Sequence, residues 1–198
     1  MPADLKSIQI PDRLVTDRLF LHKLRHEDAE EIFYTYASKP ECTKYVSWPT
    51  HQSIKDTRAY LTRTIEGWRQ AIDFSYGIRL QANGRLIGGC GFLNDHGKAQ
   101  IGYVLGVLHW GNGYATEASV KLIGMLKKQS GIFRIGSFVD ADNLASAKVL
   151  IKAGLVEEAV LQNGFQFPNQ DNATKDCILF KLPDSGNGCF SWRLSAGR

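Results

Sequence analysis

The chain has 198 residues, of which 43% are hydrophobic and 22% charged, and its formal net charge is +4. This apolar content offsets the entropy of ordering, which excludes an intrinsically disordered chain, and the length suits one domain. No apolar run reaches the roughly 18 residues of a membrane span, and the first residues lack the pattern of a secretion signal. We therefore expect a cytoplasmic protein with no membrane partner.

The cysteines and histidines show no metal-binding spacing. The four cysteines form no Cys-x-x-Cys pair, and the five histidines form neither an HxxxH nor an HExxH pair. We expect no metal site. Reduced thiols are expected at Cys42, Cys90, Cys177 and Cys189.

Hydrophobic spacing in the first third of the chain predicts one strand and two helices. Residues 1–13 are a polar lead-in, and residues 16–21 alternate as a strand does. A first helix is expected over 28–37. A second begins at Ser53, a typical N-cap residue with Asp56 three positions on. This second helix carries an apolar stripe made of Leu61, Ile65, Trp68 and Ile72.

The middle of the chain changes to a period of two residues, which predicts paired strands over 74–80, 85–92 and 100–105. Asn83-Gly84, between the first two strands, is the strongest hairpin signal in the sequence. A type I′ turn needs positive φ at both central residues, and asparagine and glycine tolerate that conformation best. We therefore predict a two-residue type I′ turn here.

The last third alternates helices and strands. The helices are expected over 114–128 and 144–152, and the strands over 135–139 and 177–182. The inward positions of the first of these helices are expected to be Ala115, Ala118, Leu122 and Met125. We predict a single α+β domain over residues 1–182, built of mixed layers, and a flexible tail over 183–198.

Nine of the 19 glycines lie within residues 84–113, and two of them, Gly111 and Gly113, separate a predicted strand from the helix that starts at Tyr114. Backbone N–H groups at a helix start have no partner within the helix, and the helix dipole adds partial positive charge there. Glycine leaves those amides open to a ligand. The pattern favours a phosphate or pyrophosphate site, and an ordinary glycine turn is the alternative.

A second polar segment opens the helix expected over 144–152. Asn143 follows a strand and precedes the helix, so its side chain is suited either to cap the helix or to bind a ligand. Ser146 lies on the same face of the helix, one turn further on. For Ser146, a small residue on the helix surface is the simpler interpretation.

The two segments together resemble the GNAT acyltransferase superfamily. The resemblance rests on Gly111-Asn112-Gly113-Tyr114-Ala115-Thr116-Glu117-Ala118, followed by Asn143-x-x-Ser146 and by Lys152-x-Gly154-Leu155. Thr16-Asp17-Arg18-Leu19, Arg85-Leu86-Ile87-Gly88 and Ile101-Gly102-Tyr103 are similar to the RimJ/RimL-like branch. The resemblance covers about residues 14–182 and implies a mixed central sheet with a splayed strand pair and helices on both faces.

The resemblance also implies acetyl-CoA as the cofactor. Its pyrophosphate would lie on the loop and helix start formed by Trp110, Gly111, Asn112, Gly113, Tyr114 and Ala115. The pantetheine arm would follow the strand from Gly102 to Gly106, where that strand splays from its neighbour. Asn143 would contact the cofactor, and Ser146 would interact with the departing thiolate. The neighbouring glycines Gly88, Gly89 and Gly91 are expected to leave room for the acceptor or the thioester.

Two positions depart from the family pattern in ways that affect the chemistry. Leu150 stands where many relatives carry a tyrosine general acid, and Gln100 stands where many carry a glutamate base. Trp110, which replaces the usual Gln or Arg, is harmless if backbone amides dominate. Candidate bases are then Asp95 and His96, which alternatively form only a solvated loop. Candidate donors to the acyl oxygen are the amides of Val104 and Leu105.

The leading hypothesis is an N-acetyltransferase that moves an acetyl group from CoA to a primary amine by direct transfer in a ternary complex. The acceptor amine would be a peptide N-terminus or a small molecule, and the protein a monomer or homodimer. A non-catalytic sensor of acyl-CoA is the alternative. Nucleic acid is not expected as a partner, except through a ribosomal substrate.

Overall fold

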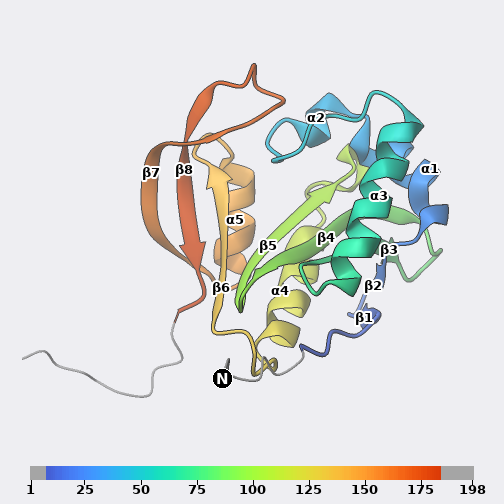
Figure 1. Cartoon of the computed structure of the whole chain (residues 1–198), viewed down its shortest axis with the longest axis horizontal. Helices are drawn as coiled ribbons and strands as arrows, with labels where there is room; N and C mark the ends of the chain where they lie inside the picture. The colour runs from blue at the N-terminus through green and yellow to red at the C-terminus, as the bar shows by residue number, and fades with distance from the viewer. Residues whose placement is uncertain (1–7, 184–198) are drawn as a thin grey trace, which may run out of the picture.

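A mixed sheet of eight strands runs through the molecule and carries the other elements on its two faces (Figure 1). The computed structural model describes residues 8–183. Within these residues the strand order is β1-β2-β3-β4-β5-β6-β8-β7. The strands are β1 (Arg13–Val15), β2 (Leu19–Lys23), β3 (Asp73–Leu80), β4 (Leu86–Asp95), β5 (Lys98–Leu105), β6 (Arg134–Asp140), β7 (Val156–Gln166) and β8 (Thr174–Lys181).

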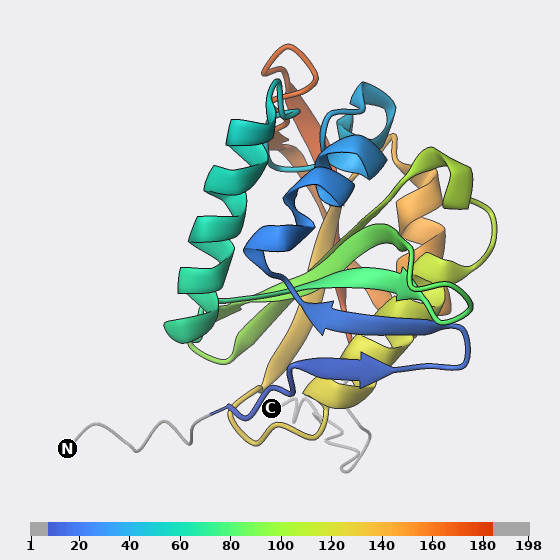
Figure 2. The ribbon, with the colours of Figure 1, turned by 90° about the vertical axis from the view of Figure 1, so that its right-hand side faces the viewer.

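The helices cover both faces of this sheet, as the resemblance implied. Figure 2 shows α3 and α4 on opposite sides of the strands. The α-helices are α1 (Ala29–Ile32), α2 (Pro40–Thr43), α3 (Ile54–Arg69), α4 (Tyr114–Leu126) and α5 (Leu144–Lys152). The short turns of helix are η1 (His26–Asp28), η2 (Phe33–Ala37) and η3 (Val107–His109).

Strands β5 and β6 are the only parallel neighbours in the described sheet, and they pair over a short distance. The register runs from Lys98 opposite Arg134 to Gln100 opposite Gly136. On its other edge, β6 pairs with β8 from Gly136 to Asp140, well past the last residue that pairs with β5. The sheet therefore opens between β5 and β6, which is the splayed pair expected from the resemblance.

Helix α3 begins as its sequence predicts and packs somewhat differently. The Asp56 carboxylate accepts hydrogen bonds from the backbone N–H of Ser53 at 2.8 Å and of Gln52 at 2.9 Å, which fixes the helix start. Ile72 was expected to continue the apolar stripe, but it lies beyond the end of the helix and is 49% exposed. The buried face of the helix consists of Thr57, Leu61, Thr64 and Trp68, so it includes two threonines that the apolar stripe did not contain.

The helix predicted over 28–37 changes its winding part of the way along. It is α-helical only from Ala29 to Ile32, and the following turn, η2, is π-helical. The Ser38 N–H therefore donates to the Phe33 carbonyl five residues earlier, at 3.2 Å. The wider turn buries Tyr36 against the sheet, and π-helical turns of this kind occur often beside functional sites.

The hairpin between β3 and β4 forms where it was predicted, but the turn type was wrong. Gly84 has a φ of 72°, whereas Asn83 is absent from the described residues with positive φ. The Leu80 N–H donates to the Arg85 carbonyl at 3.0 Å, and the Gly84 N–H donates to the Leu80 carbonyl at 2.9 Å. The loop therefore contains four residues, and glycine is needed only at the last of them.

Two edge strands lie where no strand was predicted. β1 begins at the last residue of the expected lead-in and ends just before the strand expected over 16–21, and β7 follows α5 after a short turn. β7 is exposed along almost its whole length, so its sequence lacks the alternation that marks a half-buried strand. Pairing with β8 forms it, in a register interrupted twice. Residues 1–7 of the expected lead-in and residues 184–198 of the expected tail lie outside the described residues.

The main core lies between the sheet and α4. The four positions of α4 that were predicted to face inward are all buried: Ala115, Ala118, Leu122 and Met125. A smaller core under α1 and α3 contains Ile32, Tyr36, Leu61 and Leu86. Burying aliphatic and aromatic side chains on both faces holds the sheet in place, at about 25 cal/mol per Å² of apolar surface.

The described residues contain three of the four cysteines. Cys42, Cys90 and Cys177 are free and buried, while Cys189 lies outside the described residues. Among residues 8–183 no group of His, Cys, Asp and Glu is arranged to hold a metal ion. No helix within the same range is both long and apolar enough to cross a membrane.

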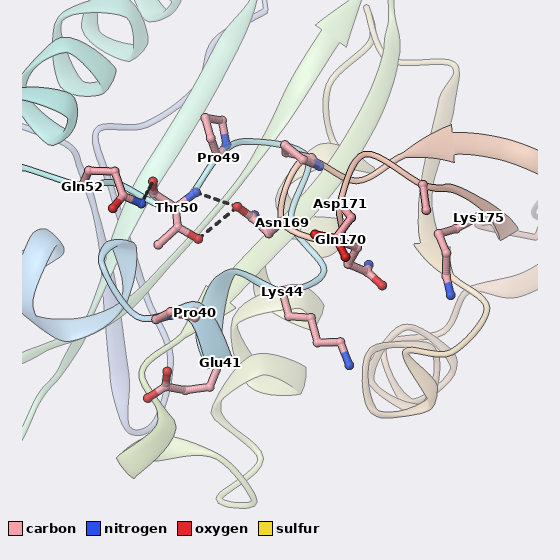
Figure 3. A pocket seen from close by; sticks show the side chains of 12 residues that line it. Pro40, Glu41, Lys44, Pro49, Thr50, Gln52, Asn169, Gln170, Asp171 and Lys175 are labelled. Atoms are coloured by element: carbon pink, nitrogen blue, oxygen red, sulfur yellow. Dashed lines mark hydrogen bonds between the residues drawn. The ribbon is translucent and has the colours of Figure 1, made fainter.

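The loop between β7 and β8 is held against the segment that joins α2 to α3 (Figure 3). The Asn169 side-chain oxygen accepts from the Thr50 N–H at 2.7 Å and from the Thr50 hydroxyl at 3.0 Å. Its amide nitrogen donates to the carbonyls of Thr43 at 2.7 Å and Trp48 at 2.9 Å. One side chain thus joins two segments that are more than 100 residues apart in the sequence.

Replacing Asn169 with alanine is expected to lower the free energy of unfolding by about 1–3 kcal/mol, because it removes the hydrogen bonds to partly buried backbone groups of Thr43, Trp48 and Thr50. Chemical denaturation measures this. Gln162→Ala, an exposed position on β7, is the matched control and is expected to be neutral. Equal stability of the Asn169 and Gln162 variants would contradict the assignment.

Candidate functional site

A cavity of about 730 Å³ begins at the gap in the sheet and continues across the face that carries α1 and α3. Nine of the predicted site residues line it: Val104, Leu105, Trp110, Gly111, Gly113, Tyr114, Ala115, Asn143 and Ser146. A second, more open depression of about 920 Å³ lies between α2 and the β7–β8 loop (Figure 3). None of the predicted site residues lines that depression, so the chemistry places the site in the first cavity.

Three predicted residues do not line this cavity. Asn112 lies in the loop before α4, and its side chain donates to the Trp110 carbonyl at 2.9 Å. Asp95 and His96 form the turn between β4 and β5, where they are largely exposed and bond to each other at 2.8 Å. The structure therefore brings neither candidate base to the cavity.

The backbone direction along β5 follows from two hydrogen bonds. The Gly106 N–H donates to the Ile87 carbonyl on the β4 side at 2.9 Å. The Ile101 carbonyl accepts from the Ser137 hydroxyl on the β6 side, also at 2.9 Å. Backbone groups of successive residues in a strand point to opposite neighbours. Odd-numbered residues of β5 therefore direct their backbone N–H and C=O groups toward β6.

This alternation decides which amides of β5 face the gap. Those of Tyr103 and Leu105 point into it, beyond the last residue that pairs with β6. Val104, which was expected to offer its amide, pairs with Gly89 and directs its backbone toward β4. The Leu105 carbonyl accepts from the Trp110 indole N–H at 2.9 Å, and its amide remains on the gap side.

The start of α4 has the geometry that the glycine pattern predicted. Gly111 and Gly113 have φ values of 75° and 78°, a left-handed conformation that favours glycine. The first helical hydrogen bond runs from the Glu117 N–H to the Gly113 carbonyl at 3.0 Å. The amides of the first turn, from Tyr114 to Thr116, precede this bond and point out of the helix end. They provide an anion-binding surface on the cavity wall.

An ion pair holds this helix start against the first strands. The Arg18 guanidinium donates to the Glu117 carboxylate at 2.7 Å and to the Asn112 carbonyl at 3.1 Å. It also lies over the Tyr114 ring, 4.6 Å from its centroid. The Thr16 hydroxyl donates to the same carboxylate at 2.5 Å. These hydrogen bonds lower the pKa of Glu117 despite its partial burial, so the ion pair persists at neutral pH.

The start of α5 brings Ser146 to the gap. The Asn143 side-chain oxygen accepts from the Ser146 N–H at 3.1 Å. Of the two roles expected for Asn143, the structure therefore shows helix capping. The Tyr103 hydroxyl donates to the Ser146 hydroxyl oxygen at 3.0 Å. Burial raises the pKa of Tyr103, and the bond to Ser146 opposes this, so the phenol stays protonated at neutral pH. Ser146 keeps its own proton for a further acceptor.

Tyr103 is a site residue that the sequence analysis missed as a side chain. Leu150, at the position of the usual tyrosine, is 1% exposed and belongs to the core. A tyrosine hydroxyl reaches the gap from β5, a different element, through the side chain of Tyr103. The signal was present in Ile101-Gly102-Tyr103, which had been used only for the resemblance. Contact with Ser146 requires the strand and helix to pack, and no local pattern encodes that.

Two glycines of β4 lie where the backbone of a neighbouring strand approaches closely. A Cβ atom at Gly88 would lie 2.2 Å from the Val104 carbonyl oxygen, and one at Gly91 would lie 2.5 Å from the Phe74 carbonyl oxygen. A side chain at either position would therefore clash with neighbouring backbone, while Gly89 and Gly91 both line the cavity. Gly102 on β5 differs, because a Cβ there would meet nothing within 4 Å.

The other end of the cavity contains a carboxylate and several aromatic rings. Asp73 on β3 pairs with Leu93 on β4, which pairs with Gln100 on β5, so the three residues form a row across one face of the sheet. Asp73 and Gln100 both line the cavity. Above them the rings of Trp48 and Tyr60 stack, with centroids 6.3 Å apart.

The Asp73 carboxylate is hydrogen-bonded by hydroxyl groups of neighbouring residues. It accepts from the Ser75 hydroxyl at 2.6 Å and from the Thr64 hydroxyl at 3.2 Å. Burial raises the pKa of Asp73, and these hydroxyl groups oppose the shift. Burial, together with the charge of Asp73, also raises the pKa of Tyr60 to about 12. An ionised Asp73 is therefore costly in the folded protein.

Comparison with known proteins shows a single family. The model of the acetyltransferase (GNAT) domain matches residues 18–156. The chain is 31% identical over 172 residues to "Uncharacterized N-acetyltransferase YoaA" of Bacillus subtilis (strain 168), covering 85% of this chain and 95% of that protein. The family match spans more than half of the chain, so this protein belongs to the GNAT acetyltransferase family.

The solved structures that share its fold include two whose bound ligands are named. The microcin C7 self-immunity acetyltransferase MccE, solved with acetyl-CoA and AMP, has a TM-score of 0.78 at 23% identity, covering 87% of this chain and 96% of that chain. RimL, the ribosomal L7/L12 alpha-N-protein acetyltransferase solved with coenzyme A, has a TM-score of 0.76 at 18% identity, covering 85% and 95%. These likenesses show that the chain has the fold expected from the sequence.

Replacing Asp73 with asparagine is expected to leave stability unchanged or to increase it at pH 8. The folded-state pKa of Asp73 is raised, so ionisation disfavours the folded state, and this cost is present only above the unfolded-state pKa of about 3.9. The advantage of the variant should therefore shrink as the pH falls toward about 4. Thermal unfolding across this range measures it. A loss of stability at pH 8 would contradict the assignment.

Proposed function

We propose that this protein transfers an acetyl group from acetyl-CoA to a primary amine by direct transfer in a ternary complex. The observation that carries the proposal is one continuous cavity. It joins the open amides at the start of α4, the gap between β5 and β6, and a polar, aromatic chamber beyond them. A long cofactor with a diphosphate at one end and a reactive group at the other fits this shape, and it leaves the chamber for an acceptor.

The residues present fit acetyl-CoA. The amides from Tyr114 to Thr116 would hold the diphosphate, and each charge-assisted bond contributes about 1.5–3 kcal/mol. The gap-side backbone groups of Tyr103 and Leu105 would hold the pantetheine amides. Lys148 and Lys152 on α5 also line the cavity and add positive charge. Acetyl-CoA supplies an acetyl thioester whose transfer to an amine releases a thiol.

The chain offers two groups for this reaction. The Leu105 amide points into the gap and is suited to donate a hydrogen bond to the acyl oxygen as negative charge develops on it. The Ser146 hydroxyl is suited to pass its proton to the departing thiolate. The Tyr103 hydroxyl, already hydrogen-bonded to Ser146, restores that proton and takes one back from solvent, which receives the proton that the amine loses. The amine loses its own proton to solvent within the open chamber. Position 100, where a glutamate base would stand, is occupied by a glutamine, which cannot accept that proton.

A non-catalytic acyl-CoA sensor remains a second candidate because of two positions. Gln100 and Leu150 remove the usual acid and base groups, and neither Asp95 nor His96 lines the cavity. A sensor would bind acetyl-CoA and release no free thiol with any amine. Thiol release in the presence of peptide N-termini and small primary amines therefore separates the two functions.

Acetyl-CoA is expected to raise the melting temperature of the protein, and Gly113→Glu is expected to abolish the rise. A glutamate there would place negative charge beside the diphosphate amides, at a φ that disfavours side chains. Gly124→Glu lies on an open face of the same helix and is the matched control. An unchanged melting curve of the native protein with saturating acetyl-CoA would refute the proposal.

Ser146→Ala is expected to lower kcat by about 100-fold and to change the KM for acetyl-CoA by less than about twofold. Tyr103→Phe is expected to lower kcat by less, because Ser146 keeps its own hydroxyl. Steady-state kinetics measure both variants. Tyr34→Phe, at an exposed tyrosine, is the control. A raised KM with unchanged kcat would assign Ser146 to cofactor binding only.

A further inference from the structure

The chamber beyond the gap contains a carboxylate that the proposed reaction does not use. We propose that Asp73 binds a second, non-reacting cationic nitrogen of the acceptor, so that the acceptor is an elongated diamine or polyamine. This inference rests on the proposed function and names the substrate class of the same site. It makes Asp73 a specificity-determining residue rather than a base.

The first argument is the missing counter-ion. Within residues 8–183, Asp73 forms none of the ion pairs found in the structure, and its hydrogen-bond partners are the hydroxyl groups of Ser75 and Thr64. Asp73 is half-buried, and charges that lose part of their hydration are usually paired, because desolvating an unpaired charge is costly. Asp73 lines a cavity, so a ligand can supply the missing positive charge.

The second argument is the chemistry around the carboxylate. The stacked rings of Trp48 and Tyr60 line the same chamber, together with Tyr36. Aromatic faces attract cations, and the attraction grows where water is excluded. Glu41 and Asp73 are the two carboxylates among the described residues that line the cavity. This end of the cavity therefore favours a cationic ligand group over a neutral or anionic one.

The third argument is distance. Asp73 and Gln100 lie in the same cross-strand row with Leu93 between them. Two strand spacings separate their backbones by roughly 10 Å, and the gap that would hold the thioester lies beyond β5. A base must approach its proton to about 3 Å or act through one water molecule. Asp73 is too far away for that role, and a second nitrogen about 10 Å from the reacting nitrogen fits.

The binding test uses the full chain saturated with coenzyme A, so that it does not depend on turnover. Isothermal titration with 1,8-diaminooctane, octylamine and 1,2-diaminoethane compares a long diamine, a monoamine of the same length and a diamine too short to span the chamber. The long diamine is expected to bind most tightly. Asp73→Asn should weaken its binding by roughly tenfold or more and leave octylamine unchanged.

The control variant is Glu66→Gln, which removes an exposed carboxylate from α3 and should bind all three amines like the native protein. Equal affinity of the native protein for the long diamine and octylamine would overturn the inference, as would a long-diamine affinity that Asp73→Asn leaves unchanged. Failure of the proposed function is distinguishable, because it appears as an absence of thiol release with every amine while diamine binding still depends on Asp73.

Discussion

The structure depends on the separation of β5 and β6 after three paired residues each. A strand that leaves its neighbour exposes backbone donors and acceptors, which must find other partners or a ligand. The Ser137 hydroxyl and the Trp110 indole satisfy two carbonyls at the edges of the gap. The amides of Tyr103 and Leu105 stay open. The cavity, the placement of Ser146 and the route of a long cofactor all follow from this one separation.

Two further contacts hold in place the elements at the two ends of the cavity. Arg18 and Glu117 fix the start of α4 against the first strands, so that the open amides of this helix stay at one end of the cavity. Asn169 fixes the β7–β8 loop to the segment after α2, beside the other end. Each joins segments far apart in the sequence. The cavity is therefore bounded at both ends by long-range polar contacts rather than by local turns.

Much of the fold followed from local patterns, and the departures have physical causes. The capping residues of α3, the inward face of α4 and the glycine-rich start of α4 were all predictable, because capping and amphipathic spacing act within a few residues. β7 was not, because an exposed edge strand needs no alternation and forms by pairing with β8. The turn at Gly84 is longer than predicted because Leu80, and not Ala82, pairs with Arg85, so that β3 ends two residues earlier than a turn at Asn83-Gly84 alone requires.

The sequence by itself determined the family, the anion-binding helix start and the candidate at Ser146, because each rests on residues that are close together in the chain. Only the tertiary structure decided which other groups meet them. Tyr103 reaches Ser146 across the packed interface of a strand and a helix, and Asp73 shares a row with Gln100 through strand pairing. Asp95 and His96 are close in sequence to β5, yet they lie at a solvent-exposed turn. Strand register sets such distances, and it is fixed by packing across the whole sheet.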